Sequence, residues 1–240
     1  MNKVDYGLDA PGVILGSIAA GIAVVAAALL VASAHAFAWL GLALIVTGVA
    51  TYASSRVGKL GIRDRLFERL ALRGDERVLD VGCGRGLLLV GAARRLANGK
   101  ASGLDLWSSA DQLDNRRDAT LANAAAEGVT ERVEVIDGDM RQMPFEAATF
   151  DVVVSNLAIH NVPTSEGRRQ AIAEIVRVLR PGGRVAIVDL AFTKNYADWF
   201  AEAGLVAVRR VWPARWFFPP LGVVTAEKVA TVTMKATTSG

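Results

Sequence analysis

Two long uncharged runs stand near the start of the chain. Residues 11–33 form a run of about 23 positions without an acidic or basic side chain, enough to cross a hydrocarbon core of roughly 30 Å as a helix. Residues 37–53 form a second run of about 17 positions, with Trp39 and Tyr52 near its ends, as interfacial aromatic residues are placed in spanning helices. This pattern predicts an N-terminal transmembrane hairpin over residues 1–54.

The connector between the two runs determines their relative direction. Only residues 34–36 separate them, so the helices must run antiparallel and both outer ends must lie on the same side of the membrane. The connector has no Lys or Arg, whereas basic residues flank the outer ends: Lys3, Arg56, Lys59, Arg63 and Arg65. The positive-inside rule therefore places the N-terminus and everything after residue 54 in the cytoplasm.

A secretory signal peptide is the alternative for the first run, because residues 34–36 have the small-any-small spacing of a cleavage site. The run is longer than the apolar part of such a peptide, Asp5 and Asp9 interrupt its basic front, and a second run follows at once. The hairpin is therefore the preferred interpretation. Small residues would let the two helices, or the helices of a homodimer, pack closely: Gly12, Gly16, Ala20, Ala23, Ala27, Gly41 and Gly48.

A basic amphipathic segment follows the hairpin. Over residues 55–73, Leu60, Arg63, Phe67 and Leu70 recur at helical spacing with further basic residues between them, which predicts a linker helix. Its cationic face could rest on anionic headgroups. The alternative is a helix that packs one face on the following domain and leaves the other solvated.

From residue 74 to residue 240 the pattern alternates between short apolar runs and amphipathic stretches, which predicts an α/β domain with a mostly parallel sheet covered on both faces. Seven strands are expected, at residues 77–81, 101–106, 133–136, 150–156, 184–190, 205–211 and 223–232. The expected helices lie at residues 87–96, 110–127, 165–179 and 195–203.

Composition narrows the function classes. A net charge of +3 and a pI near 9.2 are too mild to argue for nucleic acid, and no basic face is interleaved with aromatic residues. The single cysteine, Cys83, excludes an internal disulfide and a cysteine metal cluster, and His35 and His160 as the only histidines argue against a histidine metal site. We therefore expect no bound metal and no nucleic-acid partner.

Three alternate glycines follow the first expected strand, in the segment DVGCGRG at residues 80–86. In a parallel sheet the first strand-to-helix turn lies where ligands bind, and glycine lets the backbone approach the ligand closely. Asp105, at the end of the second expected strand, is placed to bind both hydroxyls of a ribose. These positions indicate a nucleoside site, although the third glycine comes one residue too early for the dinucleotide fingerprint.

The segment resembles the D-x-G-x-G-x-G motif of class I S-adenosylmethionine-dependent methyltransferases. The resemblance extends over nearly everything from residue 66 onward and includes GLDLW at residues 103–107, DGDM at 137–140, MPFEAATFDVVVSNLAIHNV at 143–162 and EIVRVLRPGGRVAIVD at 174–189. It implies a Rossmann-like, seven-stranded, mostly parallel methyltransferase sheet, preceded here by the transmembrane hairpin. The loop after the fourth expected strand resembles the loop of methyltransferases that act on quinones, sterols and other small apolar molecules.

The resemblance also implies roles for individual residues. Asp80 would help to hold the ammonium group of S-adenosylmethionine, Asp105 the ribose, and Asn156 would lie near the methionine portion or the transferred methyl. The implied cofactor-binding residues are Asp80, Gly82, Cys83, Gly84, Gly86, Asp105, Leu106, Asp139, Met140 and Asn156. Within this set, Asp139 and Met140 would contact the adenine, and Cys83 is expected to act as a small residue in a tight turn. Trp107 would either cover the nucleoside or merely pack.

His160 is the candidate catalytic base or acceptor-orienting residue, because it lies on the loop after the fourth expected strand, where the acceptor would lie. Asn156, at the end of that strand, is the second candidate for a place near the transferred methyl group. The alternative is a loop histidine that only packs. A bilayer anchor favours a small apolar or lipid-like acceptor, and the aromatic segment at residues 211–221 would be a lid, an interfacial patch or a packed loop. The rival functions are a dinucleotide-dependent oxidoreductase and a noncatalytic membrane assembly module.

Overall fold

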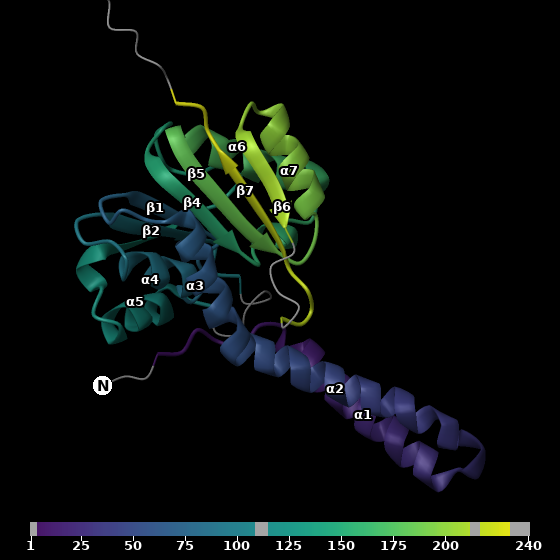
Figure 1. Ribbon diagram of the computed structural model, residues 1–240. Coiled ribbons are helices and arrows are strands. Elements are labelled where there is room, and N and C mark those ends of the chain that lie inside the picture. The colour runs from purple at the N-terminus through teal and green to yellow at the C-terminus, as the bar shows by residue number, and fades with distance from the viewer. Residues whose placement is uncertain (1–3, 109–114, 212–216, 231–240) are drawn as a thin grey trace, which may run out of the picture.

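The computed structural model describes residues 4–108, 115–211 and 217–230. It consists of an α/β domain and a helical hairpin that projects away from one end of it (Figure 1). The hairpin comprises α1 (Pro11–Leu30), the short helix η1 (Ala32–Phe37) and α2 (Ala38–Ala53). Both of its long helices are apolar and long enough to cross a membrane.

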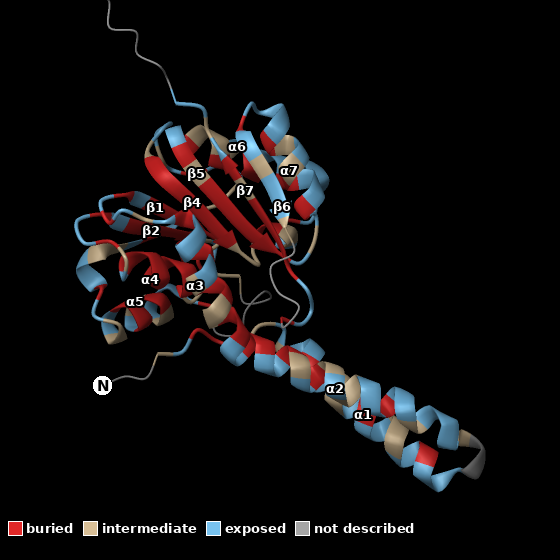
Figure 2. Ribbon diagram, viewed as in Figure 1, coloured by how far each residue is buried: buried red, intermediate tan, exposed pale blue. Residues whose placement is uncertain are grey.

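Glycines hold the two hairpin helices close together. A Cβ atom added to Gly21 would lie 2.6 Å from the carbonyl oxygen of Gly41, and one added to Gly48 would lie 2.6 Å from the Ile18 side chain. No larger residue fits at these crossings, which is the packing that small residues permit between spanning helices. Most of the remaining hairpin surface is exposed and apolar (Figure 2), unlike a helix pair buried in a soluble core.

The second hairpin helix does not stop at the membrane boundary that hydropathy predicts. It continues through a π-helical turn, η2 (Ser54–Gly58), into α3 (Lys59–Leu70), so that residues Ala34–Leu70 form one helix of 37 residues. The buried face of α3 is centred on Ile62, Leu66, Phe67 and Leu70, and Leu60, which the sequence pattern also placed on that face, packs against the same core while partly buried. Packing of α3 on the α/β domain, one of the two alternatives for this segment, is therefore observed.

The α/β domain contains a seven-stranded sheet with the order β3-β2-β1-β4-β5-β7-β6. Strands β1 to β5 are parallel, and β7 runs antiparallel to both of its neighbours. The strands are β1 (Arg77–Val81), β2 (Lys100–Asp105), β3 (Val133–Asp137), β4 (Phe150–Asn156), β5 (Leu179–Asp189), β6 (Val206–Val211) and β7 (Gly222–Glu227). The predicted mostly parallel, Rossmann-like sheet is confirmed.

Helices cover both faces of this sheet (Figure 1). One core cluster joins the sheet to α3, α4 (Leu87–Ala93) and α5 (Arg117–Ala126), and the other joins it to α6 (Ser165–Val178) and α7 (Thr193–Glu202). The short helices η3 (Thr130–Arg132) and η4 (Ile159–Asn161) lie in loops. The parallel strands all end at the edge of the sheet from which the hairpin projects (Figure 1).

Several predicted boundaries shift in the structure. Strand β5 begins at Leu179 and runs through the Pro-Gly-Gly segment that was expected to separate a helix from a strand, because this segment still hydrogen-bonds to the chain beyond β7. Helix α4 ends at Ala93, before the predicted residue 96, and β7 ends at Glu227, before the predicted residue 232. The first part of the helix expected at residues 110–127 lies outside the described residues, and the described part begins at Arg117.

Candidate active site

A glycine-rich turn connects β1 to α4 and forms the floor of the site. Gly82 and Gly86 have φ values of +71° and +84°, which L-residues rarely adopt. A Cβ atom on Gly82 would lie 2.3 Å from the Cβ of Ala158, so the loop after β4 approaches the turn too closely for a side chain. Gly86 is the N-cap residue of α4 and is not among the residues that line the cavity described below.

Asp80, on β1 just before this turn, carries a buried carboxyl group. Its Oδ2 accepts a hydrogen bond of 2.8 Å from the backbone amide of Leu89, and its Oδ1 has no hydrogen-bond partner among the described residues. Burial, and to a lesser degree the nearby Asp105, raise the pKa of Asp80 to about 8. An unpartnered buried acceptor of this kind favours a cationic donor in the cavity.

Asp105 ends β2 and is held by three donors. The amide of Gly84 donates to its Oδ2 over 2.7 Å, and the amide of Trp107 and the side chain of Asn115 donate to its Oδ1 over 2.7 and 3.2 Å. Its carboxylate is therefore fixed at the glycine-rich turn with lone pairs left over for hydroxyl groups. Asn115 Oδ1 is buried and also has no partner among the described residues, so a second unused acceptor lies at the cavity.

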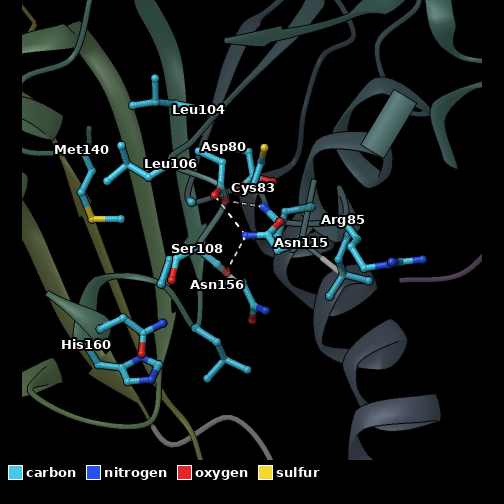
Figure 3. A pocket seen from close by; sticks show the side chains of 18 of the residues that line it. Asp80, Cys83, Arg85, Leu104, Leu106, Ser108, Asn115, Met140, Asn156 and His160 are labelled. Carbon is cyan, nitrogen blue, oxygen red and sulfur yellow. Dashed lines mark hydrogen bonds between the residues drawn. The ribbon is translucent and has the colours of Figure 1, made fainter. Parts of the chain in front are cut away.

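The side of the cavity next to β3 is formed by the loop at residues 138–141. Asp139 binds its neighbour Arg141 through both carboxylate oxygens at 2.6 to 3.0 Å, and these hydrogen bonds lower the pKa of Asp139. Met140 lies beside it, on the opposite side of the cavity from Arg85 (Figure 3). The indole of Trp107 donates to Asp137 over 2.8 Å, and its side chain packs against the core cluster beside the cavity.

The loop after β4 brings His160 to the cavity together with an acid from β5. His160 Nδ1 lies 2.5 Å from Oδ1 of Asp189, whose side chain is fully buried. The amides of His160 and Leu190 and the hydroxyl of Tyr196 donate hydrogen bonds to this carboxylate, over 3.0, 2.8 and 3.3 Å. Asp189 thus sets the orientation of the imidazole ring, which leaves Nε2 as the nitrogen available to a ligand.

One cavity of about 410 Å³ connects these groups. Figure 3 shows Asp80 and Cys83 at the glycine-rich turn and His160 at the other end of the same cavity, with Asn156 between them. Nine of the ten predicted cofactor-binding residues line it, Gly86 being the exception. The thiol of Cys83 is buried and touches the position that a Cβ on Gly103 would occupy, which agrees with the expected role of a small residue in a tight turn.

The N-terminal segment at residues 4–10, here named the strap, also lines this cavity through Tyr6, Asp9 and Ala10. Figure 1 shows the strap, in purple, reaching along the domain to the start of α1. Lys59 of α3, itself buried, donates to the carbonyl groups of Tyr6 and Gly7 over 2.9 and 2.8 Å and to Asp9 over 3.3 Å. The base of the hairpin is therefore part of the cavity wall.

Asp5 connects the strap to the glycine-rich turn. Arg85 donates to its carbonyl oxygen over 2.9 Å and to its carboxylate over 3.0 Å. Asn123 of α5 accepts from the amide of Asp5 over 2.9 Å and donates to the carbonyl oxygens of Asp5 and Arg85 over 2.9 and 2.8 Å. Sequence reasoning assigned no role to these residues, nor to Asn115 and Asp189. Arg85 and Asp189 lie within the quoted motifs, at positions to which the resemblance gave no contact, whereas Asp5, Asn115 and Asn123 lie outside them.

The strand order, the glycine-rich turn and the acid at the end of β2 together define a class I S-adenosylmethionine-dependent methyltransferase domain. Residues 79–187 match the family described as "Methyltransferase domain".

Curated relatives match a similar stretch of the chain. The sterol 4-C-methyltransferase strm-1 of Caenorhabditis elegans is 30% identical over 55% of this chain and 36% of its own length. A ubiquinone/menaquinone biosynthesis C-methyltransferase of a Ruegeria species is 31% identical over 55% of this chain and 50% of its own length. A phthiotriol/phenolphthiotriol dimycocerosates methyltransferase of Mycobacterium tuberculosis is 31% identical over 61% and 50%. The chain thus spans about a third to a half of these relatives.

Solved structures share the fold at lower identity. The [4+2]-cyclase SpnF superposes with a TM-score of 0.60 at 20% identity over 72% of this chain and 81% of its own. A SAM-dependent methyltransferase from Aquifex aeolicus gives 0.58 at 19% identity over 71% and 92%. Geranyl diphosphate C-methyltransferase from Streptomyces coelicolor, solved with S-adenosyl-L-homocysteine, gives 0.57 at 16% identity over 70% and 76%. At these identities the likeness shows the fold alone.

Proposed function

We propose that this protein is a membrane-anchored enzyme that transfers a methyl group from S-adenosylmethionine to a small apolar or lipid-like acceptor. One observation carries the proposal: a single cavity joins three parts of the molecule. They are the glycine-rich turn with Asp80 and Asp105, here named the cradle, the His160–Asp189 pair, and the base of the apolar hairpin. The printed names of the curated relatives, which include sterol and quinone methyltransferases, support the acceptor class.

The residues at the cradle fit S-adenosylmethionine. The unpartnered Oδ1 of Asp80 suits its ammonium group, and the Gly82 turn leaves no side chain between backbone and ligand. Asp105 would bind the ribose hydroxyls, with Leu106 beside it and Asp139 and Met140 near the adenine. When bound, the cofactor supplies an electrophilic methyl group, so the chain has to bind, align and exclude water.

We assign to His160 the role of the base that removes a proton from the acceptor. Because Asp189 faces Nδ1 over 2.5 Å, Nε2 is left to take a proton from a hydroxyl or an acidic carbon. The buried carboxylate would then stabilise the imidazolium that forms. Asn156, at the end of β4, lines the same part of the cavity and would orient the acceptor or the methionine portion of the cofactor.

The hairpin supplies the membrane anchor in this proposal, with the N-terminus and the catalytic domain on the cytoplasmic side. The exposed apolar surface of α1 and α2 supports it, as does the placement of basic residues after the second span. Gly21, Gly41 and Gly48 are used within the hairpin, whereas a Cβ on Gly12 or Gly16 would meet nothing within 4 Å. A homodimer through that part of α1 stays a prediction.

Calorimetric titration of S-adenosylmethionine and S-adenosylhomocysteine into the detergent-purified full chain tests the cofactor. We expect binding that Asp105→Ala loses and that Asp75→Ala keeps, because Asp75 is an exposed residue paired with Arg73 away from the cavity. Failure of the folded wild type to bind either ligand would contradict the proposal. The dinucleotide oxidoreductase and the noncatalytic assembly module would then be the functions to test.

A further inference from the structure

The end of the α/β domain that carries the cavity is also the end that meets the hairpin. Ala10, which lines the cavity, directly precedes Pro11, the first residue of α1. The loop before β7 reaches the same place, because the amide of Phe218 donates to Ser54 Oγ over 2.8 Å at the point where α2 gives way to η2. The cavity therefore lies at the level where the apolar hairpin begins.

Large exposed apolar side chains gather at this end of the domain. Leu106 follows β2, Leu190 and Phe192 follow β5, and Phe218 lies in the loop before β7; they are 61%, 46%, 43% and 39% exposed. Leu106 and Leu190 also line the cavity. We name these four residues the rim. Exposed apolar side chains that gather on one surface mark a site of contact with a protein, a ligand or a membrane.

The rim is not explained by general apolar exposure of the domain. At the opposite end of the sheet, Val206 begins β6 opposite Glu227, the last residue of β7, and Val229 lies two residues beyond Glu227; both side chains are smaller than those of the rim. The two ends are about 20 Å apart, because strands of six residues rise about 3.3 Å per residue. Only the rim end is continuous with the hairpin.

The size of the cavity limits what can enter it. At about 410 Å³ it lies near the lower limit of the range of roughly 300 to 1,000 Å³ for sites that enclose one drug-sized ligand. The cofactor would occupy the side of the cavity at Asp80 and Asp105, which leaves the side at His160 for the reactive group of the acceptor. The rest of a lipid-like acceptor must extend past the rim.

We propose that the rim rests on the surface of the bilayer that holds the hairpin, and that the cavity opens directly onto the lipid. The acceptor is then an amphipathic lipid whose reactive head enters beside His160 while its apolar chain stays in the bilayer. This inference rests on the proposed function for the identity of the reaction, but the position of the rim is a separate physical claim.

Quenching by brominated lipids measures that position. A polarity-sensitive fluorophore is attached in separate proteins to Phe192→Cys and Phe218→Cys, and to Val206→Cys and Val229→Cys as controls that are 48% and 56% exposed in the wild type. The native Cys83 is buried and stays in place. Each full-length protein is reconstituted into phosphatidylcholine/phosphatidylglycerol vesicles with and without bromine on the acyl chains.

We expect brominated chains to reduce the emission at both rim positions and to leave both control positions unchanged. Unquenched rim labels, or equal quenching at the rim and at the controls, would overturn the inference. Titration of S-adenosylmethionine into the same vesicles keeps the two proposals apart: a protein that binds the cofactor but shows no rim quenching retains the proposed function and loses this inference.

The acceptor is tested with the same vesicles, prepared from lipids of the native cells and supplied with methyl-tritiated S-adenosylmethionine. Radioactive methyl groups recovered in the chloroform-soluble fraction support an acceptor that resides in the bilayer. Radioactive methyl groups found only in water-soluble products of an added aqueous extract would show that the acceptor reaches His160 from water, and would contradict the inference.

Discussion

The buried carboxyl of Asp80 should make cofactor binding depend on pH. Its pKa in the free protein is raised to about 8, mainly by burial, and Oδ1 has no partner among the described residues. A cationic ammonium group at that oxygen favours the ionised carboxylate. Binding of S-adenosylmethionine near neutral pH should therefore expel the proton of Asp80.

The size of the effect follows from the pKa. With a value of about 8, Asp80 is about nine-tenths protonated at pH 7, so binding should release about 0.9 proton per cofactor. The observed association constant scales with the ionised fraction, so it should rise about tenfold between pH 6 and pH 7, which is about 1.4 kcal/mol. The rise should level off near pH 8, where the amino group of the cofactor also begins to lose its proton.

Calorimetry at pH 6.0 to 7.5, repeated in buffers of different ionisation enthalpy, measures both the affinity and the number of protons released. Asp80→Asn is the matched control, because an amide still accepts the hydrogen bond from Leu89 but has no proton to lose. This variant should bind the cofactor weakly and without the pH dependence. A wild-type affinity that is constant over this range, with no proton release, would refute the reasoning.

The same carboxyl links pH to the stability of the cofactor-free protein. Its pKa lies near 8 in the folded chain and near 3.9 in the unfolded chain, so the folded state holds a proton that the unfolded state has lost. The contribution of Asp80 is complete below about pH 4, declines as pH rises, and is lost above about pH 8. Urea unfolding should show a larger loss of stability from pH 5 to pH 7 in the wild type than in Asp80→Asn.

Three further substitutions test other parts of the site. Gly82→Ala should lower the free energy of unfolding by about 1 to 3 kcal/mol or more in urea titrations, because the new Cβ would meet Ala158 at 2.3 Å and φ is +71°; unchanged stability would contradict the close approach. Asp189→Asn should lower kcat at least about tenfold without changing cofactor affinity, since it acts through His160, and an unaltered pH–rate profile would argue against this role. Asp5→Ala should weaken cofactor binding about two- to fivefold, as expected for a partly exposed ion pair, with Asp75→Ala as a neutral control in the same titration.

The strands nearest the site were the most predictable part of the fold. β1 and β4 have the bounds that the sequence pattern predicts, because both have an apolar centre rich in Val or Leu, and Gly82 follows β1 directly. The division between hairpin and linker helix was less predictable. Hydropathy changes near residue 54, but a helix need not break where its surroundings change, and no proline interrupts residues 38–70.

The site residues that were predicted belong to short local motifs, whereas the contacts that were missed join segments far apart in the chain. Asp80 and Asp105 belong to motifs carried by single strand ends, so their spacing along the chain predicts their place. The contact between Asp189 and His160 depends on the pairing of β4 with β5, in which Asn156 lies opposite Val188. That register brings the two strand ends to the same edge, and strand order cannot be read from the local pattern of either segment.

The strap gives the hairpin a part in the active site beyond anchoring. Asp5 is bound to Arg85 within the glycine-rich turn, and six residues later the chain enters α1 at Pro11. Lys59, on the helix that continues from α2, holds the same strap from the other side. Both hairpin helices are thus connected to the glycine-rich turn through the strap. Displacement of the hairpin would pull on this segment, so removal of the anchor should alter cofactor affinity as well as membrane attachment.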